Sequence, residues 1–336
     1  MRVGKLMKKI KIIFMSNAEF GVPAFQKIAE NPEFKISSLI TIPDKQKGRH
    51  LGISLSPIKN AAQKYNIPIL ETENIKDEKW EKTIRDQNPD VIVVASFGQI
   101  IPETLINIPK HKMLNIHPSL LPRYRGPSPI QYAILNGDKT TGVTIMLVDK
   151  EMDHGDILGT WNLEIENWEP AYKELHDKLA NIGADLIVKL IPDWIAGKIK
   201  PVVQDHSKAT YTKKISKEDG HIDWNEPAEV IKRKIRAYNP WPGAYSFYEK
   251  LPSKKVRLIF LKARISECLG VKLPSSLRSL TRGLNFGEIF KTNDGFGVQT
   301  GKGVLEIKSL KPEGKKEMEA SDFLRGNIDI IGKMLA

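Results

Sequence analysis

The chain has 336 residues, and its 52 Lys and Arg exceed its 40 Asp and Glu, which gives a formal net charge of +12. The composition is that of a folded globular protein, and no apolar run approaches the ~20 residues that a membrane-spanning helix needs. The single cysteine, Cys268, excludes an internal disulfide and a cysteine-rich metal site, as is typical of a reducing cytoplasm. We therefore expect a cytoplasmic protein that does not bind membranes, and the length predicts two domains.

The first half of the chain alternates short apolar runs with amphipathic stretches. The opening MRVGKLMKKIKIIFMSN has too short an apolar run for a signal peptide and indicates a first strand. Later runs such as FKISSLITI, DVIVVASF and KMLNIHP carry few charges, which is typical of a parallel sheet covered on both faces. We therefore predict an open, mostly parallel, Rossmann-like α/β domain over residues 1–200. A helical pattern follows at residues 169–198, in which Pro192 is expected to break or kink the helix.

From about residue 207 the pattern changes to short alternating strands separated by Gly, Asn and Asp turns, as in KVRLIFLKARI and GVLEIKSL. This pattern predicts a small OB-like β-barrel domain over residues 207–336. Residues 201–336 hold 25 Lys and Arg against 16 Asp and Glu, so most of the positive excess lies in this part. A basic excess favours a polyanionic partner such as a nucleic acid, although a merely solvated basic surface has the same composition.

Signatures of common cofactors are missing from the sequence. The first predicted strand is followed by MSNAEFGVPAF, which has one glycine where a dinucleotide-binding turn has three, and no GxxxxGK[ST] occurs. The seven histidines are scattered without paired spacing, so we expect no metal site. Dinucleotide, P-loop and zinc chemistry are therefore disfavoured.

Two polar motifs, LNIHPSLLPRYRG and EMDHGDIL, suggest a catalytic site. Asn115 and His117 stand two residues apart at the end of a predicted strand and so face the same side. Asp153 is expected near the same sheet edge. An amide, an imidazole and a carboxylate suit the attack of an amine on a carbonyl. Asn115 and a protonated His117 would stabilise the oxyanion, while Asp153 would orient His117 and accept a proton. A purely structural interpretation also stands. In it Asn115 caps the end of a strand, His117 is a core histidine and Asp153 holds a tight turn.

These motifs and their spacing resemble those of the N10-formyltetrahydrofolate-dependent formyltransferases. The resemblance extends from about residue 10 over the rest of the chain. It implies that Asn115, His117 and Asp153 form the catalytic trio and that the formyl donor is N10-formyltetrahydrofolate. It also implies that an SLLP segment binds this donor, namely Ser119, Leu120, Leu121 and Pro122.

Two further segments, KISKEDGHIDWNEPAEVIKRKIRAYNPWPGAYS and LKPEGKKEMEASDFLRG, resemble the branch of the family that formylates methionyl initiator tRNA. The resemblance implies direct attack by the methionine amine, without a covalent enzyme intermediate, and a tRNA-binding second domain. We expect a monomer. Candidate phosphate contacts are Lys213, Lys214, Lys232, Arg233, Lys234 and Arg236 in the second domain. In the loop after the second predicted strand the candidates are Lys45, Lys47 and Arg49.

The chain departs from the family pattern at two places. Ser16 and Asn17 stand where the family has Gly and Thr, and Leu51 and Gly52 stand where two lysines are common. The path of the first turn and the tRNA contact of the basic loop are therefore open. Three alternative functions remain: a formyltransferase for a sugar-nucleotide amine, a hydrolase in which water replaces the amine, and a non-catalytic RNA-binding protein.

Overall fold

The computed structural model describes residues 8–44, 55–166, 168–252, 254–266 and 283–336. The chain divides into two compact units. The first comprises Met1–Pro129, Lys139–Asn167 and Leu175–Lys213, and the second comprises Ile130–Asp138, Trp168–Glu174 and Lys214–Ala336. Within the described ranges, no helix has both the length and the hydropathy required to span a bilayer.

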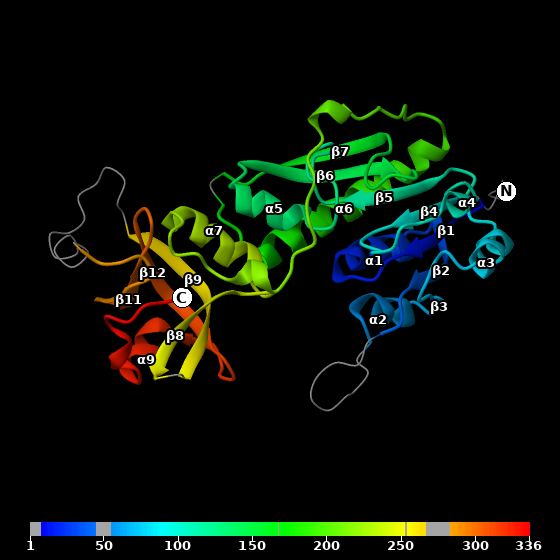
Figure 1. The fold of residues 1–336 in the computed structure, drawn as a ribbon. Coiled ribbons are helices and arrows are strands. Elements are labelled where there is room, and N and C mark those ends of the chain that lie inside the picture. The colour runs from blue at the N-terminus through cyan, green and yellow to red at the C-terminus, as the bar shows by residue number, and fades with distance from the viewer. Residues whose placement is uncertain (1–7, 45–54, 167, 253, 267–282) are drawn as a thin grey trace, which may run out of the picture. The chain divides into compact units, whose positions relative to one another are not determined.

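The first unit is built on a seven-stranded sheet with the order β3-β2-β1-β4-β5-β6-β7 (Figure 1). Its strands are β1 (Ile10–Met15), β2 (Phe34–Thr41), β3 (Ile69–Glu71), β4 (Val91–Val94), β5 (Met113–His117), β6 (Thr140–Leu147) and β7 (Ile157–Glu164). The first five strands are parallel, and β6 and β7 add an antiparallel edge. This arrangement confirms the predicted mostly parallel, Rossmann-like sheet.

Helices pack on both faces of this sheet. They are α1 (Val22–Glu30), α2 (Pro57–Lys64), α3 (Lys79–Gln87), α4 (Glu103–Ile106) and α6 (Tyr172–Ile195), with short 3-10 turns at Glu19–Gly21 and His206–Lys208. Neighbouring side chains of β1 point to opposite faces. Ile13 joins a buried cluster with Trp80 of α3 and Leu105 of α4. Phe14 points the other way, and its ring packs edge-on against Phe25 of α1, with centroids 5.3 Å apart.

The long helix α6 differs from its sequence-based expectation. Sequence analysis expected a break or a kink at Pro192, and the break is wrong, because α6 continues to Ile195. A proline this close to the end of a helix removes one backbone donor and disturbs only the last turn. The long part that precedes it is unaffected and packs against the sheet, where Leu179, Ala184 and Ile187 are fully buried.

The second unit holds an antiparallel sheet with the order β10-β11-β12-β9-β8, and a further strand, β13, pairs with β12. Its strands are β8 (Ala244–Leu251), β9 (Lys254–Ser266), β10 (Ile289–Thr292), β11 (Gly295–Gln299), β12 (Val304–Pro312) and β13 (Met318–Glu319). Its helices are α7 (Ala228–Tyr238) and α9 (Ala320–Arg325), with 3-10 turns at Glu218–Gly220 and Ile328–Ile330, and α5 (Pro129–Asn136) lies where this unit begins.

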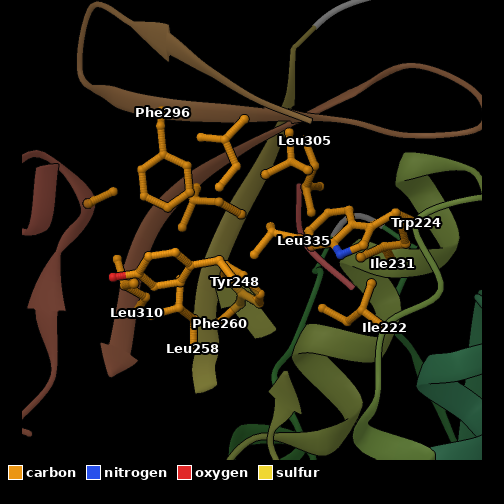
Figure 2. Packing of buried hydrophobic residues seen from close by; sticks show 14 of the residues in the cluster. Ile222, Trp224, Ile231, Tyr248, Leu258, Phe260, Phe296, Leu305, Leu310 and Leu335 are labelled. Atoms are coloured by element: carbon orange, nitrogen blue, oxygen red, sulfur yellow. The ribbon is translucent and has the colours of Figure 1, made fainter. Parts of the chain in front are cut away.

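The antiparallel sheet curls around a core of its own. Trp224, Tyr248, Phe260, Phe296 and Leu335 are buried in it, and the rings of Trp224 and Phe260 meet edge-on at 5.7 Å (Figure 2). A curled antiparallel sheet with this core confirms the predicted OB-like fold. Each unit therefore buries its own set of apolar side chains.

Candidate active site

Strand β5 brings two polar side chains to the carboxyl edge of the first sheet. It lies between β4, to which it is parallel, and β6, to which it is antiparallel. Its interior residues are buried, which fixes the strand and so the direction of Asn115 and His117. The His117 side chain is buried, and Asn115 is half-buried. Because they stand two residues apart, both side chains leave the strand on the same side.

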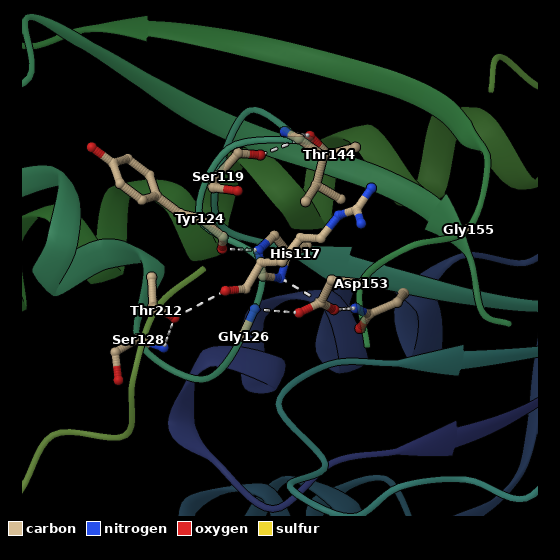
Figure 3. Close-up of polar contacts among 12 residues, drawn as sticks. His117, Ser119, Tyr124, Gly126, Ser128, Thr144, Asp153, Gly155 and Thr212 are labelled. Carbon is tan, nitrogen blue, oxygen red and sulfur yellow. Dashed lines mark hydrogen bonds and ion pairs between the residues drawn. The ribbon is translucent and has the colours of Figure 1, made fainter. Parts of the chain in front are cut away.

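Asp153 reaches these two side chains from the connection between β6 and β7. Its Oδ1 accepts a hydrogen bond from Asn115 Nδ2 at 3.3 Å and lies 3.5 Å from His117 Nδ1. Its Oδ2 accepts a hydrogen bond from the Gly126 amide at 2.8 Å. Figure 3 shows the carboxylate between the imidazole and this amide. The structure thus brings the three predicted catalytic residues into direct contact.

The His117 ring has a defined tautomer. Its Nε2 lies 2.9 Å from the carbonyl oxygen of Tyr124, and a carbonyl only accepts, so Nε2 carries hydrogen and donates (Figure 3). The Nδ1 atom is then the nitrogen that faces Asp153. A proton placed on Nδ1 would be shared with that carboxylate. The arrangement is therefore suited to moving a proton between the imidazole, the carboxylate and a reacting group.

The SLLP segment, residues 119–122, follows His117 closely in the chain and is held by hydrogen bonds. The Ser119 hydroxyl donates to the Arg123 carbonyl at 2.7 Å, and Thr144 of β6 bonds this segment twice. The Thr144 hydroxyl donates to the Ser119 carbonyl at 2.7 Å and accepts from the Leu121 amide at 3.2 Å. Ser119 and Leu121 are buried, whereas Leu120 and Pro122 are half-buried. Side-chain contacts to a ligand are thus available mainly from Leu120 and Pro122, and donor binding by this segment stays a prediction.

The turn after β1 has a defined path despite its departure from the family pattern. The Asn17 side chain accepts from the Ile42 amide at 2.9 Å and from the Thr41 hydroxyl at 3.2 Å, and it donates to the Phe97 carbonyl. Asn17 therefore connects the carboxyl ends of β1, β2 and β4. Ser16 is fully buried next to Gly21, where a Cβ would collide with the serine hydroxyl.

The basic candidates for tRNA binding differ in how they are placed. Lys213 and Lys214 are exposed. Lys232 pairs with Glu169 at 2.6 Å, and Lys234 pairs with Glu226 at 2.5 Å. Arg233 and Arg236 donate to the carbonyls of Leu135 and Pro170, and burial lowers the pKa of Arg236. Lys45, Lys47 and Arg49 lie outside the described residues. A role in tRNA binding stays a prediction for all of these residues.

Several residues that build the site were missed by sequence analysis. Thr144 supports the SLLP segment, and Gly126 anchors the Asp153 carboxylate. Arg125 and Gln204 are both buried and are linked by hydrogen bonds next to the Asp153 turn. Arg125 and Gly126 belong to the same motif as His117, and this proximity was the available signal. Gln204 lies between the two predicted domains, where no motif marks it.

Metal ligation has no support in the described residues, among which no three His, Cys, Asp or Glu side chains are grouped to hold an ion. The assembled groups are an amide donor, an imidazole and a carboxylate at the edge of an open α/β sheet. Such a set can stabilise an oxyanion and transfer a proton without a covalent bond to the protein.

Comparison with known proteins identifies the family. Residues 8–191 match the model of the formyl transferase family, and residues 214–327 match that of the formyl transferase C-terminal domain. The chain belongs to the formyl transferases. Two curated relatives, both named methionyl-tRNA formyltransferase, come from Caldanaerobacter subterraneus and Syntrophomonas wolfei. They are 37% and 38% identical to this formyl transferase over 95% and 94% of its length, and over 97% and 96% of their own.

Solved structures share the fold at lower identity. The structure of HypX from Aquifex aeolicus in complex with tetrahydrofolic acid superposes with a TM-score of 0.57 at 18% identity, and the match covers 96% of this chain and 48% of HypX. An N-formyltransferase from Helicobacter canadensis in complex with folinic acid and dTDP-3-aminofucose gives a TM-score of 0.62 at 18% identity, with 89% and 99% of the two chains covered. At this identity the likeness supports the fold of this formyl transferase.

Proposed function

We propose that this chain transfers the formyl group of N10-formyltetrahydrofolate to the α-amino group of methionyl initiator tRNA. One observation carries the proposal. Asn115, His117 and Asp153 converge at the sheet edge of a chain that is 37–39% identical, over nearly its whole length, to several methionyl-tRNA formyltransferases. Together the three residues place an amide donor, an imidazole and a carboxylate side by side, which are groups that formyl transfer to an amine requires.

The reaction adds a neutral amine to the formyl carbon and then expels the donor nitrogen. As the C–N bond forms, the carbonyl oxygen gains negative charge. Asn115 Nδ2 uses one hydrogen on Asp153 and has a second to donate to this oxygen, and a protonated His117 can stabilise the same charge. The Asp153 carboxylate accepts the proton that the attacking nitrogen loses. Cleavage of the bond to the donor nitrogen, which takes up a proton, gives formyl-methionyl-tRNA and tetrahydrofolate.

The three groups act mainly after the substrates have bound. Asp153 is anchored by the Gly126 amide, and His117 by the Tyr124 carbonyl, so neither must reorganise during the reaction. Donors held in advance near a developing charge stabilise the transition state more than the ground state. We therefore infer that the trio sets the turnover rate and that other contacts set substrate affinity.

An acceptor test separates this function from its alternatives. The protein is incubated with labelled N10-formyltetrahydrofolate together with charged initiator tRNA, a UDP-amino sugar, or water alone. We expect the label on the methionyl-tRNA. Label on the sugar amine would identify a sugar-nucleotide formyltransferase, and labelled formate from water alone would identify a hydrolase. Absence of any transfer would favour a non-catalytic RNA-binding protein.

We further propose that the enzyme acts in the cytoplasm, as a monomer, to supply formylated initiator tRNA for translation initiation. The exposed Lys213 and Lys214 are the first residues to test for contact with the tRNA backbone. Sedimentation at working concentration measures the assembly state, and a mass of twice the chain would contradict the monomer.

A further inference from the structure

Gln204 contacts the backbone of the Asp153 turn from behind the catalytic carboxylate. Its Nε2 donates to the Asp153 carbonyl at 3.0 Å and to the Gly155 carbonyl at 2.7 Å. Its Oε1 accepts from Arg125 Nη2 at 2.8 Å and from Nε at 3.2 Å. The Gln204 side chain therefore connects the Asp153 turn to Arg125, and both of the linking residues are buried, with 3% and 2% of their surface exposed.

The chemistry of the partners fixes the orientation of the Gln204 amide. A guanidinium has only donors, so it must face Oε1, and the two backbone carbonyls have only acceptors, so they must face Nε2. Rotating the amide by half a turn would lose all four of these hydrogen bonds.

Arg125 is itself held from several directions. Its Nη2 donates to His206 Nδ1 at 2.8 Å, and its Nη1 donates to the Tyr211 hydroxyl at 3.3 Å. Its backbone amide donates to the Thr210 carbonyl, and its carbonyl accepts from the Thr212 amide, both at 2.8 Å. Arg125 is therefore a rigid support for Gln204.

Asp153 needs such support because its backbone is strained. It has a φ of 52°, in the left-handed region that few residues other than glycine adopt, and such backbones persist only where their surroundings enforce them. Two adjacent residues hold it from two sides. Gly126 donates to the carboxylate, whereas Arg125, through Gln204, holds the carbonyls on either side of the turn.

We propose that Arg125 and Gln204 are positioning residues for formyl transfer, which keep the Asp153 carboxylate against Asn115 and His117. This inference rests on the proposed function, since it assigns the pair to the catalytic carboxylate. The pair acts through Asp153, because both side chains are buried and the hydrogen bonds that they make go to protein atoms. Its loss should therefore lower the turnover rate and leave the Michaelis constants of both substrates near their native values.

Gln204→Glu tests the proposal with little change in shape. The substituted side chain keeps an acceptor for Arg125 but turns a carboxylate oxygen toward the carbonyls of Asp153 and Gly155. We expect kcat to fall about ten- to hundredfold, because a displacement of ~1 Å in a reacting group can cost ~10²-fold. The melting temperature should fall only modestly, since the counter-ion that the buried guanidinium gains offsets part of the cost of the two lost hydrogen bonds. Gln63→Glu, on the exposed side of α2, is the matched control and should leave kcat and the melting temperature unchanged.

A double-variant cycle separates positioning from general destabilisation. If Gln204 acts only through Asp153, Gln204→Glu should cause no further loss of kcat in an Asp153→Asn background. Arg125→Lys is the second variant, since it keeps the charge but loses the planar fork that orients the amide, and it should show the same dependence on Asp153.

The outcomes separate this inference from the proposed function. Native kcat in Gln204→Glu and Arg125→Lys, with a large loss in Asp153→Asn, would overturn the positioning role and leave the proposed function standing. Additive losses in the double variant, or losses that merely follow the melting temperature, would overturn it too. A wild-type protein that does not formylate charged initiator tRNA would refute the proposed function, and the inference with it, before any variant is measured.

Discussion

The two oxygens of the Asp153 carboxylate make different contacts. Oδ2 is anchored by the Gly126 amide, and Oδ1 faces the Asn115 amide and the His117 ring. An asparagine at this position would keep its oxygen on the Gly126 amide and so turn its NH2 group toward the Asn115 donor and toward His117 Nδ1, which could then accept a hydrogen bond but no longer share a proton with a carboxylate. Asp153→Asn therefore both removes the proposed proton acceptor and disturbs the contact with His117.

Asp153→Asn should accordingly lower kcat by about 10²-fold or more, with the affinity for the formyl donor changing little, because the lost interactions act on the transition state. Steady-state kinetics and donor binding by calorimetry measure the two quantities. Asp193→Asn, at an exposed position near the end of α6, is the matched control. A near-native kcat for Asp153→Asn would remove this residue from the mechanism.

Glu306 of β12 offers a second test at the scale of a single residue. Burial raises the pKa of its carboxyl, but hydrogen bonds from Arg264 and Lys308 outweigh this and hold the pKa below its ordinary value of 4.5. A lowered pKa in the folded state stabilises the protein above pH 4.5. This contribution is lost as the pH falls through the lowered value.

Glu306→Gln should therefore destabilise the second unit at pH 7 and matter progressively less below pH ~4.5. We expect a loss of about 1.5 kcal/mol at pH 7, the lower end for hydrogen bonds to charged groups, because Arg264 is largely exposed. Urea unfolding between pH 3 and pH 7 measures the difference, with the exposed Glu313→Gln as control. A difference that grows on acidification would contradict the assigned charge state.

At the scale of elements, the position of β5 depends on how closely α6 packs against the sheet. A Cβ on Gly183 of α6 would come within 2.6 Å of Ile116, the residue of β5 between Asn115 and His117. Replacing glycine by alanine at an exposed helix position stabilises a protein by ~1 kcal/mol, but here the added methyl group has no space.

Gly183→Ala should thus destabilise the first unit by about 1–3 kcal/mol and lower kcat, since β5 must shift to admit the methyl group. Asn181→Ala, two residues away on the exposed side of α6, is the control and should be neutral or slightly stabilising. Thermal unfolding and formylation kinetics check both effects. A stabilised, fully active Gly183→Ala would show that α6 does not set the position of β5.

The apolar strands of the first unit were the elements that the sequence predicted best. Runs such as DVIVVASF and KMLNIHP coincide with β4 and β5, because strands buried on both faces need nearly unbroken apolar sequences. The short β3 and the helix α3 were not predicted. Trp80 and Ile84 are the buried residues of α3, and two apolar positions give a weak periodic signal.

The proposed catalytic trio could be predicted from sequence because its residues lie in two compact motifs with family spacing. The residues that hold the trio in place could not. Thr144, Arg125 and Gln204 act through side-chain hydrogen bonds between segments that are far apart in the chain, and such pairings appear only when the fold is known. Support around a site leaves no periodic pattern in the sequence.

At the scale of the whole molecule, the net charge of +12 leads to a prediction about salt. When the logarithm of the affinity for tRNA is plotted against the logarithm of the salt concentration, each phosphate contact made by a cation contributes about −0.7 to −0.9 to the slope. Replacing both Lys213 and Lys214 by Gln should make this slope shallower by about 1 to 2, weaken tRNA binding and leave donor binding unchanged. The exposed Lys198→Gln is the control. Equal slopes for the wild-type and doubly substituted proteins would exclude this pair from the tRNA contact.

Single-turnover formylation, with enzyme and donor in saturating excess over charged initiator tRNA, tests most directly whether the three residues act on the transition state. Under these conditions substrate binding and product release do not limit the observed rate. If Asn115, His117 and Asp153 act on the transition state, label should pass to the methionyl amine at least ~10²-fold more slowly with His117→Ala than with the wild-type protein. Equal single-turnover rates for the two proteins would show that His117 does not act on the transition state.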